Sequence, residues 1–190
     1  MKITAIILAS GSSKRMGKDK LILEYKDKRI FEYVIDLVSK FPFDEKIIIT
    51  NNDEIINYAK IKGILNYNNP HHEIGKSESI KIGIENSKKE NGYMFFVSDQ
   101  PLLRIKTVKQ ILYQFSKKPE LITYPMYEGH RGSPVIFPNK YKMELLKLTE
   151  DMGGASIIDE VNSQGVLIDN CVENIDIDNQ EDYSRILKYE

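Results

Sequence analysis

Small and cationic residues gather in residues 8–20, directly after the apolar run 3–7. The cations are Lys14, Arg15, Lys18 and Lys20. Only one carboxylate, that of Asp19, opposes them. The glycines and serines of the stretch allow backbone N–H groups to approach a ligand closely, and the cations attract negative charge. In α/β proteins a loop of this kind after a short strand is a place where phosphate groups bind. The stretch therefore predicts an anion-binding loop.

Two common phosphate-binding motifs do not fit this loop. A P-loop has four residues between its first glycine and its Gly-Lys pair, whereas five residues separate Gly11 from Gly17. Asp19 also stands where a P-loop has the Ser or Thr that holds magnesium. A dinucleotide-binding fingerprint would need a glycine at position 13, which is Ser13. The loop therefore binds its anion by another pattern.

A second chemical signal is a carboxylate that follows an apolar strand. Residues 93–97 are all apolar, and Asp99 comes two residues after them. Open α/β sheets bind ligands at the carboxyl ends of their strands. From its position alone, Asp99 is either a helix N-cap or a metal ligand.

An α/β framework is needed to bring these two segments together. We expect strands at residues 3–7, 46–50, 63–67, 93–97, 121–124 and 166–168, and helices built around residues 30–41, 53–59, 105–115 and 180–189. Strands and helices that alternate in this way predict a parallel sheet with right-handed crossovers. Residues 77–88 fit either a strand or a helix, because the isoleucines alternate while Ser77 and Glu78 are typical of a helix start.

Two further segments carry polar side chains that such a sheet could present. Glycines flank His130 and Arg131, which predicts a hairpin at the edge of the site. Residues 174–178 are expected to form a late strand, and alternation along it places Asp176 and Asp178 on one face. These aspartates are either a solvated edge with a helix cap or carboxylates for a metal.

Composition limits the remaining possibilities. A chain of 190 residues with 41% hydrophobic content predicts one domain, residues 1–190. The net charge of −1 favours neither nucleic acid nor an anionic membrane as a partner. Cys171 is the only cysteine, so an internal disulfide is excluded. We find no leader and no apolar run long enough for a membrane span, and expect a cytoplasmic protein.

The anion-binding loop resembles the Leu-Ala-x-Gly-x-x-x-Arg-Met-Gly-x-x-Lys signature of nucleotidyltransferases related to molybdenum cofactor cytidylyltransferase and guanylyltransferase. Four later segments are similar to motifs of that family in the same order: residues 75–83, 99–101, 151–155 and 176–182. Residues 131–135 resemble an acceptor-pocket segment, although Ser133 replaces its histidine. The resemblance implies an α/β fold, specifically a three-layer α/β/α sandwich with a mostly parallel, Rossmann-like sheet, similar to the nucleotide-diphospho-sugar transferases. It also favours a helix for residues 77–88.

The resemblance further implies a reaction and a set of site residues. The reaction is transfer of CMP from Mg-CTP to the terminal phosphate of molybdopterin, the organic part of the molybdenum cofactor, with release of pyrophosphate. Catalytic roles are implied for Arg15, Lys20 and Asp99, and Mg²⁺ (or Mn²⁺) would be held by Asp99 and Asp178, with Asp176 as the alternative second ligand. Substrate-binding roles are implied for Leu8, Ala9, Ser10, Gly11, Ser12, Ser13, Arg15, Lys20, Gly75, Ser79 and Arg131.

Three alternatives to this reaction stay open. The first alternative is GTP as the nucleotide. CTP is favoured because residues 8–13 and the Asp99-Gln100 pair look more like the cytidylyl branch of the family. An enzyme of the same fold could use another phosphorylated acceptor. A protein of a different class could bind the molybdenum cofactor and hand it to a target molybdoenzyme without any turnover.

Overall fold

Strand β1 (Ile3–Leu8) runs through the centre of the protein in a computed structural model that describes residues 2–11, 19–87 and 92–189. Five of its six residues are buried, because both faces of the sheet are covered, and this explains the uninterrupted apolar run. The neighbours β4 (Glu45–Ile49) and β6 (Gly92–Val97) are both parallel to β1. Leu8 is in register with Ile49 and with Val97, so the carboxyl ends of the three strands meet at one edge.

The sheet extends from this centre in both directions. Its remaining strands are β5 (Leu65–Tyr67), β7 (Ile122–Tyr127), β8 (His130–Arg131), β9 (Val135–Phe137) and β10 (Ser163–Leu167). The order is β10-β7-β9-β6-β1-β4-β5, with β8 paired to β7. The hairpin strand β8 is antiparallel to β7, β9 is antiparallel to both β6 and β7, and the other pairs are parallel. The prediction of a mostly parallel sheet is confirmed.

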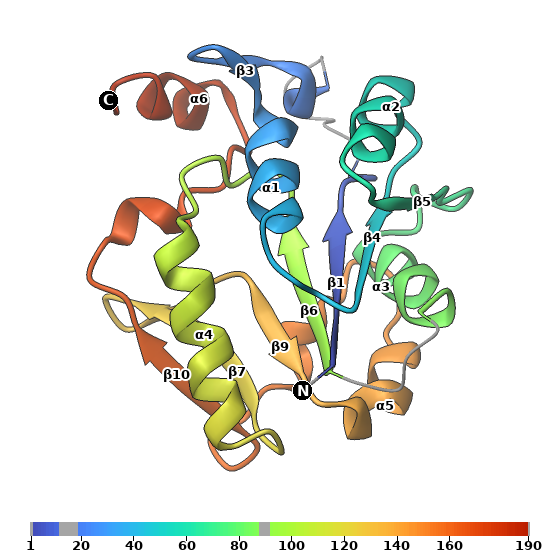
Figure 1. The fold of residues 1–190 in the computed structure, drawn as a ribbon, viewed down its shortest axis with the longest axis vertical. Helices are drawn as coiled ribbons and strands as arrows, with labels where there is room; N and C mark the ends of the chain where they lie inside the picture. The colour runs from blue at the N-terminus through green and yellow to red at the C-terminus, as the bar shows by residue number, and fades with distance from the viewer. Residues whose placement is uncertain (1, 12–18, 88–91, 190) are drawn as a thin grey trace.

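Helices cover both faces of this sheet (Figure 1). One core joins Ala5 and Ile7 to side chains of α1 (Ile30–Ser39), α2 (Asp53–Ile61), α4 (Ile105–Lys117) and α6 (Gln180–Ile186). The opposite core joins Ile6 to side chains of α3 (Lys76–Glu85) and α5 (Lys142–Leu146). The fold is therefore the three-layer α/β/α sandwich that the resemblance implied, and residues 77–88 begin as a helix. The single-domain assignment stays a prediction.

Short elements complete the chain. A small antiparallel ribbon pairs β2 (Glu24–Tyr25) with β3 (Lys28–Arg29). Four 3₁₀ turns lie at Lys20–Ile22, Asn139–Tyr141, Gly154–Ile157 and Cys171–Asn174. In the described part of the chain, no helix has both the length and the apolar character needed to cross a membrane.

The hairpin expected around His130 and Arg131 is present. Glu128 and Gly129 both have positive φ, 47° and 86°, which is the conformation of a type I′ turn. Tyr127 pairs with His130 across that turn. His130 and Arg131 therefore form the returning strand of the hairpin and not its tip.

The prediction of a late strand at residues 174–178 is wrong. The segment begins at the end of a 3₁₀ turn, and no ladder of hydrogen bonds is recorded for it in the described sheet. The Ile177 N–H donates to the carbonyl of Asp99, at 3.3 Å, and so connects this segment to the site region. Ile175 and Ile177 are nevertheless buried while Asp176 and Asp178 are exposed. The predicted placement of the two aspartates on one face is therefore observed. It results from burial of the two isoleucines that alternate with them and not from pairing with a neighbouring strand.

Candidate active site

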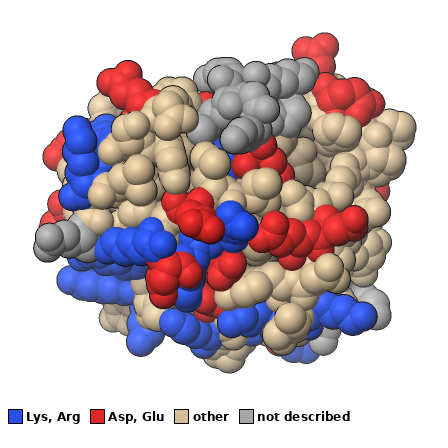
Figure 2. Space-filling model, turned by 90° about the horizontal axis from the view of Figure 1, so that it is seen from above, with Lys and Arg blue, Asp and Glu red and all other residues tan. Residues whose placement is uncertain are grey.

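A cleft of about 540 Å³ opens at the carboxyl ends of β1 and β6. The predicted site residues that line it are Leu8, Ser10, Gly11, Lys20, Gly75, Ser79, Asp99 and Asp178. They come from segments far apart in the chain, and the parallel register of the central strands brings them to one edge. Seen from above, onto the strand ends, acidic and basic side chains lie next to one another across this face (Figure 2).

Lys20 is the centre of the charged part of the cleft. Its Nζ lies 2.5 Å from Oδ2 of Asp99 and 2.9 Å from Oδ1 of Asp178. Its position is set by Asp19, whose Oδ1 accepts a hydrogen bond from the Leu21 N–H and thereby caps the 3₁₀ turn that begins at Lys20. One ammonium thus holds together two carboxylates that are 79 residues apart in the sequence.

The electrostatics of this group follow from partial burial. Burial by itself would lower the pKa of Lys20, but attraction and hydrogen bonding by Asp99, and then by Asp178, outweigh it and raise the pKa above its ordinary 10.5. Lys20 therefore carries a full positive charge at neutral pH. The side chains of Lys20 and Asp99 are only 15% and 17% exposed, so water screens their pair weakly.

Asp176 belongs to the same charged group. Asp176 is exposed as a residue, but the protein around its carboxyl group reduces the hydration of that group. This desolvation, followed by repulsion from Asp99, raises the pKa of Asp176 from 3.8 to about 6. Lys20 pulls this pKa in the opposite direction. Among the described residues, negative charge from Asp99, Asp176 and Asp178 is therefore concentrated around the Lys20 ammonium, and a bound cation would favour the ionised form of Asp176.

The carboxylates of Asp99 and Asp178 fit a divalent cation. Both contact a single nitrogen atom, so one small ion could reach both, and oxygen ligands suit Mg²⁺ and Mn²⁺. Among the described residues, no three or more His, Cys, Asp and Glu side chains form a complete metal cage. A site with only two carboxylates is the usual form when substrate phosphates supply further ligands to Mg²⁺.

A buried hydrogen-bond network supports the other side of the cleft. Oγ of Ser10 lies 2.5 Å from Oγ of Ser79, and Nδ2 of Asn69 lies 3.0 Å from Ser79 Oγ and 3.4 Å from Ser10 Oγ. Asn69 is fully buried. Its backbone is held by two bonds with the side chain of Asn51, at 2.7 and 2.8 Å. The sequence analysis did not identify Asn69, because an asparagine in a polar loop carries no periodic signal.

The turn at residues 150–153 closes the cleft beside the start of α3. The Ser77 N–H donates to the carbonyl of Glu150, at 3.2 Å. A Cβ atom on Gly75 would lie 2.5 Å from Glu150 O and from Asp151 Oδ1, so only glycine fits there. Glu150, which replaces the glycine of the similar family motif, adopts a left-handed φ of 52°. This conformation favours glycine, so Glu150 adopts it at a cost of about 1 kcal/mol or more.

The structure does not bring every predicted residue into the cleft. Ala9 is buried, and its N–H bonds to the carbonyl of Ile49 at the sheet edge, at 2.9 Å. The Arg131 guanidinium packs 5.4 Å from the centre of the Tyr124 ring and donates to Ile158 O at 3.1 Å, away from the cleft lining. Ser12, Ser13 and Arg15 lie outside the described residues.

Other lining residues were not predicted as ligand-binding residues. They are Leu21, His72, Glu73, Lys76, Val97, Ser98 and Asp151. His72 lies 3.6 Å from Glu73 through its Nδ1. The sequence signal for this group was weak, because its members come from a 3₁₀ turn, two loops, the start of α3 and the end of β6, with no fixed spacing.

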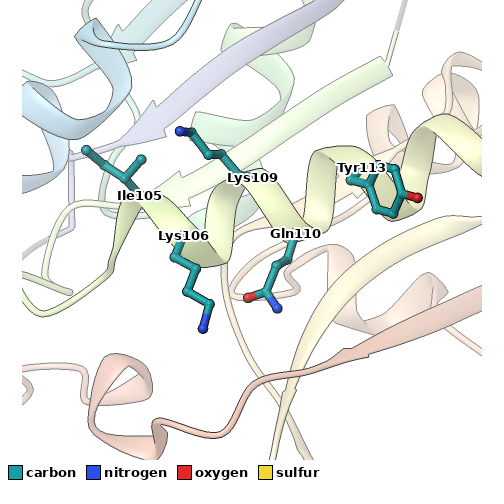
Figure 3. A pocket seen from close by; sticks show the side chains of 5 residues that line it. All are labelled: Ile105, Lys106, Lys109, Gln110 and Tyr113. Carbon is teal, nitrogen blue, oxygen red and sulfur yellow. The ribbon is translucent and has the colours of Figure 1, made fainter.

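A second hollow, of about 460 Å³, lies along the outer face of α4 (Figure 3). It is lined by Ile105, Lys106, Lys109, Gln110 and Tyr113, all from the one helix. None of the predicted site residues contributes to it. The chemistry that the sequence suggests therefore belongs to the cleft at the strand ends.

Comparison with known proteins identifies the family. The family model described as "MobA-like NTP transferase domain" matches residues 5–165. The chain belongs to this family. The match includes residues 5–8 of β1, the whole of α3 and Asp99. It ends before Asp176 and Asp178, which the fold brings back to the neighbourhood of Asp99.

Curated relatives and solved structures agree with this membership. The chain is 26% identical to a probable molybdenum cofactor guanylyltransferase of Natranaerobius thermophilus, over 98% of this chain and 96% of that protein. It is 24% identical to the molybdenum cofactor cytidylyltransferase of Escherichia coli, over 95% of this chain and 93% of that protein. The crystal structure of Rv0371C of Mycobacterium tuberculosis in complex with manganese has a TM-score of 0.83 and 22% identity, with full coverage of both chains. The MobA-like family and its fold are thus established for this chain.

Proposed function

We propose that the protein transfers CMP from CTP to the terminal phosphate of molybdopterin and releases pyrophosphate. The observation that supports this most directly is the contact of Lys20 with both Asp99 and Asp178 in the cleft of a MobA-like transferase fold. A site for a metal–triphosphate complex needs carboxylates that hold the metal and cationic side chains that neutralise the phosphates, close to one another. The relatives named for guanylyl and cytidylyl transfer to the molybdenum cofactor support the substrate class.

The reaction asks for positioning and charge neutralisation more than for proton transfer. An oxygen of the acceptor's phosphomonoester attacks the α-phosphorus, a new P–O bond forms, and the bond from the α-phosphorus to the bridging oxygen of pyrophosphate breaks. The attacking phosphate is already an anion, so no strong general base is required. Lys20 is placed to offset the negative charge of the triphosphate and of the departing pyrophosphate.

Asp99 and Asp178 would hold the divalent cation, and we propose Mg²⁺ with Mn²⁺ as an alternative. When bound, the ion would neutralise charge on the phosphoryl oxygens. The role of Arg15 in binding the triphosphate is also part of the proposal, from its place in the loop motif. Enzymes of nucleoside triphosphates work where these nucleotides are abundant, so we propose the cytoplasm as the compartment.

The choice of CTP over GTP rests on the loop residues 8–13 and on the Asp99-Gln100 pair. A pocket built for one base leaves polar groups unpaired when the other base enters. We therefore expect CTP to exceed GTP by roughly tenfold or more in kcat/KM. Guanylyl transfer is the second candidate, because the relative from Natranaerobius thermophilus carries that name.

The deciding experiment is a nucleotide panel with purified protein, Mg²⁺ and molybdopterin, with pyrophosphate release as the measurement. Pyrophosphate from CTP alone would support cytidylyl transfer, whereas preferred use of GTP would replace it by guanylyl transfer. Asp99→Ala is the matched variant, and it should lose far more than tenfold in turnover while its circular dichroism spectrum stays unchanged. A protein that releases no pyrophosphate from any nucleotide, yet delivers the molybdenum cofactor to a molybdoenzyme, would be a carrier.

A further inference from the structure

Two hydroxyl groups of the cleft, those of Ser10 and Ser79, share one hydrogen bond whose direction the surroundings determine. Their oxygens are 2.5 Å apart, and either could be the donor. Ser79 is 4% exposed, and no other acceptor for its proton is recorded among the described residues. If Ser10 donated to Ser79, the Ser79 proton would be buried without an acceptor, which is unfavourable. Ser79 is therefore the donor and Ser10 the acceptor.

Asn69 reinforces this direction. Its Oδ1 accepts from the backbone N–H of His71, at 3.0 Å. A backbone N–H can only donate, so the amide oxygen must face His71, and the NH₂ group must face the two serines. Asn69 then donates to both hydroxyl oxygens, at 3.0 Å and 3.4 Å. With its two lone pairs engaged by Ser79 and Asn69, Ser10 retains only its own proton for a ligand.

We infer that Asn69 is a positioning residue that, together with Ser79, makes the Ser10 hydroxyl a hydrogen-bond donor to an acceptor oxygen of the bound nucleotide. Ser10 is partly exposed and lines the cleft, whereas Asn69 does not reach the lining. The ligand atom is an oxygen without a proton, either of a phosphate or of a base carbonyl. This inference rests on the proposed function, because it takes a nucleotide as the ligand of the cleft.

The test compares the loss caused by Ser10→Ala in two backgrounds, with the Kd for the preferred nucleoside triphosphate and Mg²⁺ measured by calorimetry. With Asn69 in place, Ser10→Ala should weaken binding roughly tenfold or more if the lost bond is to a charged oxygen. In the Asn69→Asp background, Ser10→Ala should raise the Kd by less than about twofold. The carboxylate introduced at position 69 then accepts the protons of both serines, so the Ser10 O–H no longer donates to the ligand. The added negative charge of Asp is present in both members of that pair and cancels.

The controls separate positioning from folding. Ser116→Ala removes an exposed hydroxyl on α4 that donates to Tyr113 O, away from the cleft lining, and it should leave the Kd unchanged. Melting temperatures are measured for every variant. If Asn69→Asp does not fold, Asn69→Leu is the replacement background. Without the amide, the Ser10 hydroxyl can turn towards Ser79, so Ser10→Ala should weaken nucleotide binding by less than about threefold. Inorganic tripolyphosphate is a second probe, which has phosphate oxygens but no base. If Ser10 donates to a phosphate oxygen, Ser10→Ala weakens binding of both probes; if it donates to a base carbonyl, only nucleotide binding is weakened.

The outcomes that overturn the inference are specific. An equal loss in both backgrounds would show that residue 69 has only a structural role, and no loss on Ser10→Ala would show that Ser10 is not a donor to the ligand. Either result leaves the proposed function standing if the wild-type protein binds the nucleotide. A wild-type protein that binds neither CTP nor GTP would remove the proposed function and the inference together.

Discussion

Replacing Lys20 by methionine tests the electrostatic organisation of the cleft. The variant keeps an unbranched side chain of similar length but leaves Asp99, Asp176 and Asp178 without this ammonium. We expect the metal-free variant to be less stable than the wild type, because the carboxylates then repel one another with less compensation.

The magnitude follows from the burial of the pair. Lys20 donates to two carboxylates while 15% exposed, and Asp178 is 54% exposed, so most of the effect comes from Asp99. Losing a hydrogen bond to a charged group in such a place costs about 2–3 kcal/mol. For a chain of 190 residues this corresponds to a melting temperature lower by about 5–10 °C. Since the pKa of Lys20 lies above 10.5 in the folded protein, its contribution is complete at neutral pH and is lost only in more alkaline solution.

The assay is thermal unfolding of both proteins in EDTA and in a series of Mg²⁺ concentrations. Mg²⁺ should stabilise Lys20→Met more than the wild type, because the ion does not have to compete with an ammonium for the two carboxylates. Equal melting temperatures in EDTA would refute the stabilising role of Lys20. Equal stabilisation by Mg²⁺ would refute the idea that ammonium and metal share one position.

Two further predictions concern stability. Burial opposes ionisation of Asp36, but hydrogen bonds from Lys28, Lys62 and Tyr58 outweigh it and lower the pKa of Asp36 from 3.8 to about 2. Asp36→Asn should therefore lower the free energy of unfolding by about 2 kcal/mol at pH 7, and urea titrations should show the difference fading as the pH falls through this range; a constant difference would contradict the prediction. Gly75→Ala should lower the stability by more than 1 kcal/mol, because φ is 137° and its Cβ would meet the turn at residue 150. Gly63→Ala, at φ 70° with open space around it, is the matched control and should cost less in the same titration.

The strands and helices of the fold could be predicted because they follow from burial patterns, whereas the three-layer arrangement was implied by the family resemblance. The apolar run of β1 and the helical spacing of α1 and α4 each reflect a face that must be covered. The same reasoning placed Asp176 and Asp178 on one face, although no strand ladder forms there. Burial of alternate side chains is a local property of the chain, and it can be predicted without knowing the partners.

The contacts of the site could not be predicted in the same way. The pairing of Lys20 with Asp99 depends on the register of the central strands, which has no signal in the sequence. The cap made by Asp19 fixes only the local turn that begins at Lys20. The contact of the Arg131 guanidinium with the Tyr124 ring was likewise not predictable from the spacing of residues along the hairpin. The role of Arg131 in binding the acceptor stays a prediction.

The return of the C-terminal segment to the N-terminal half has a consequence for biosynthesis. The Tyr25 hydroxyl donates to Tyr189 O at 2.9 Å, and Ile177 bonds to Asp99, so residues 175–189 are anchored on parts of the chain made long before them. On the ribosome, Lys20 and Asp99 emerge early, but the second carboxylate, Asp178, arrives only when nearly the whole chain has been synthesised. A translation product truncated before Asp178 would therefore contain Lys20 and Asp99 but lack the second carboxylate that contacts the Lys20 ammonium.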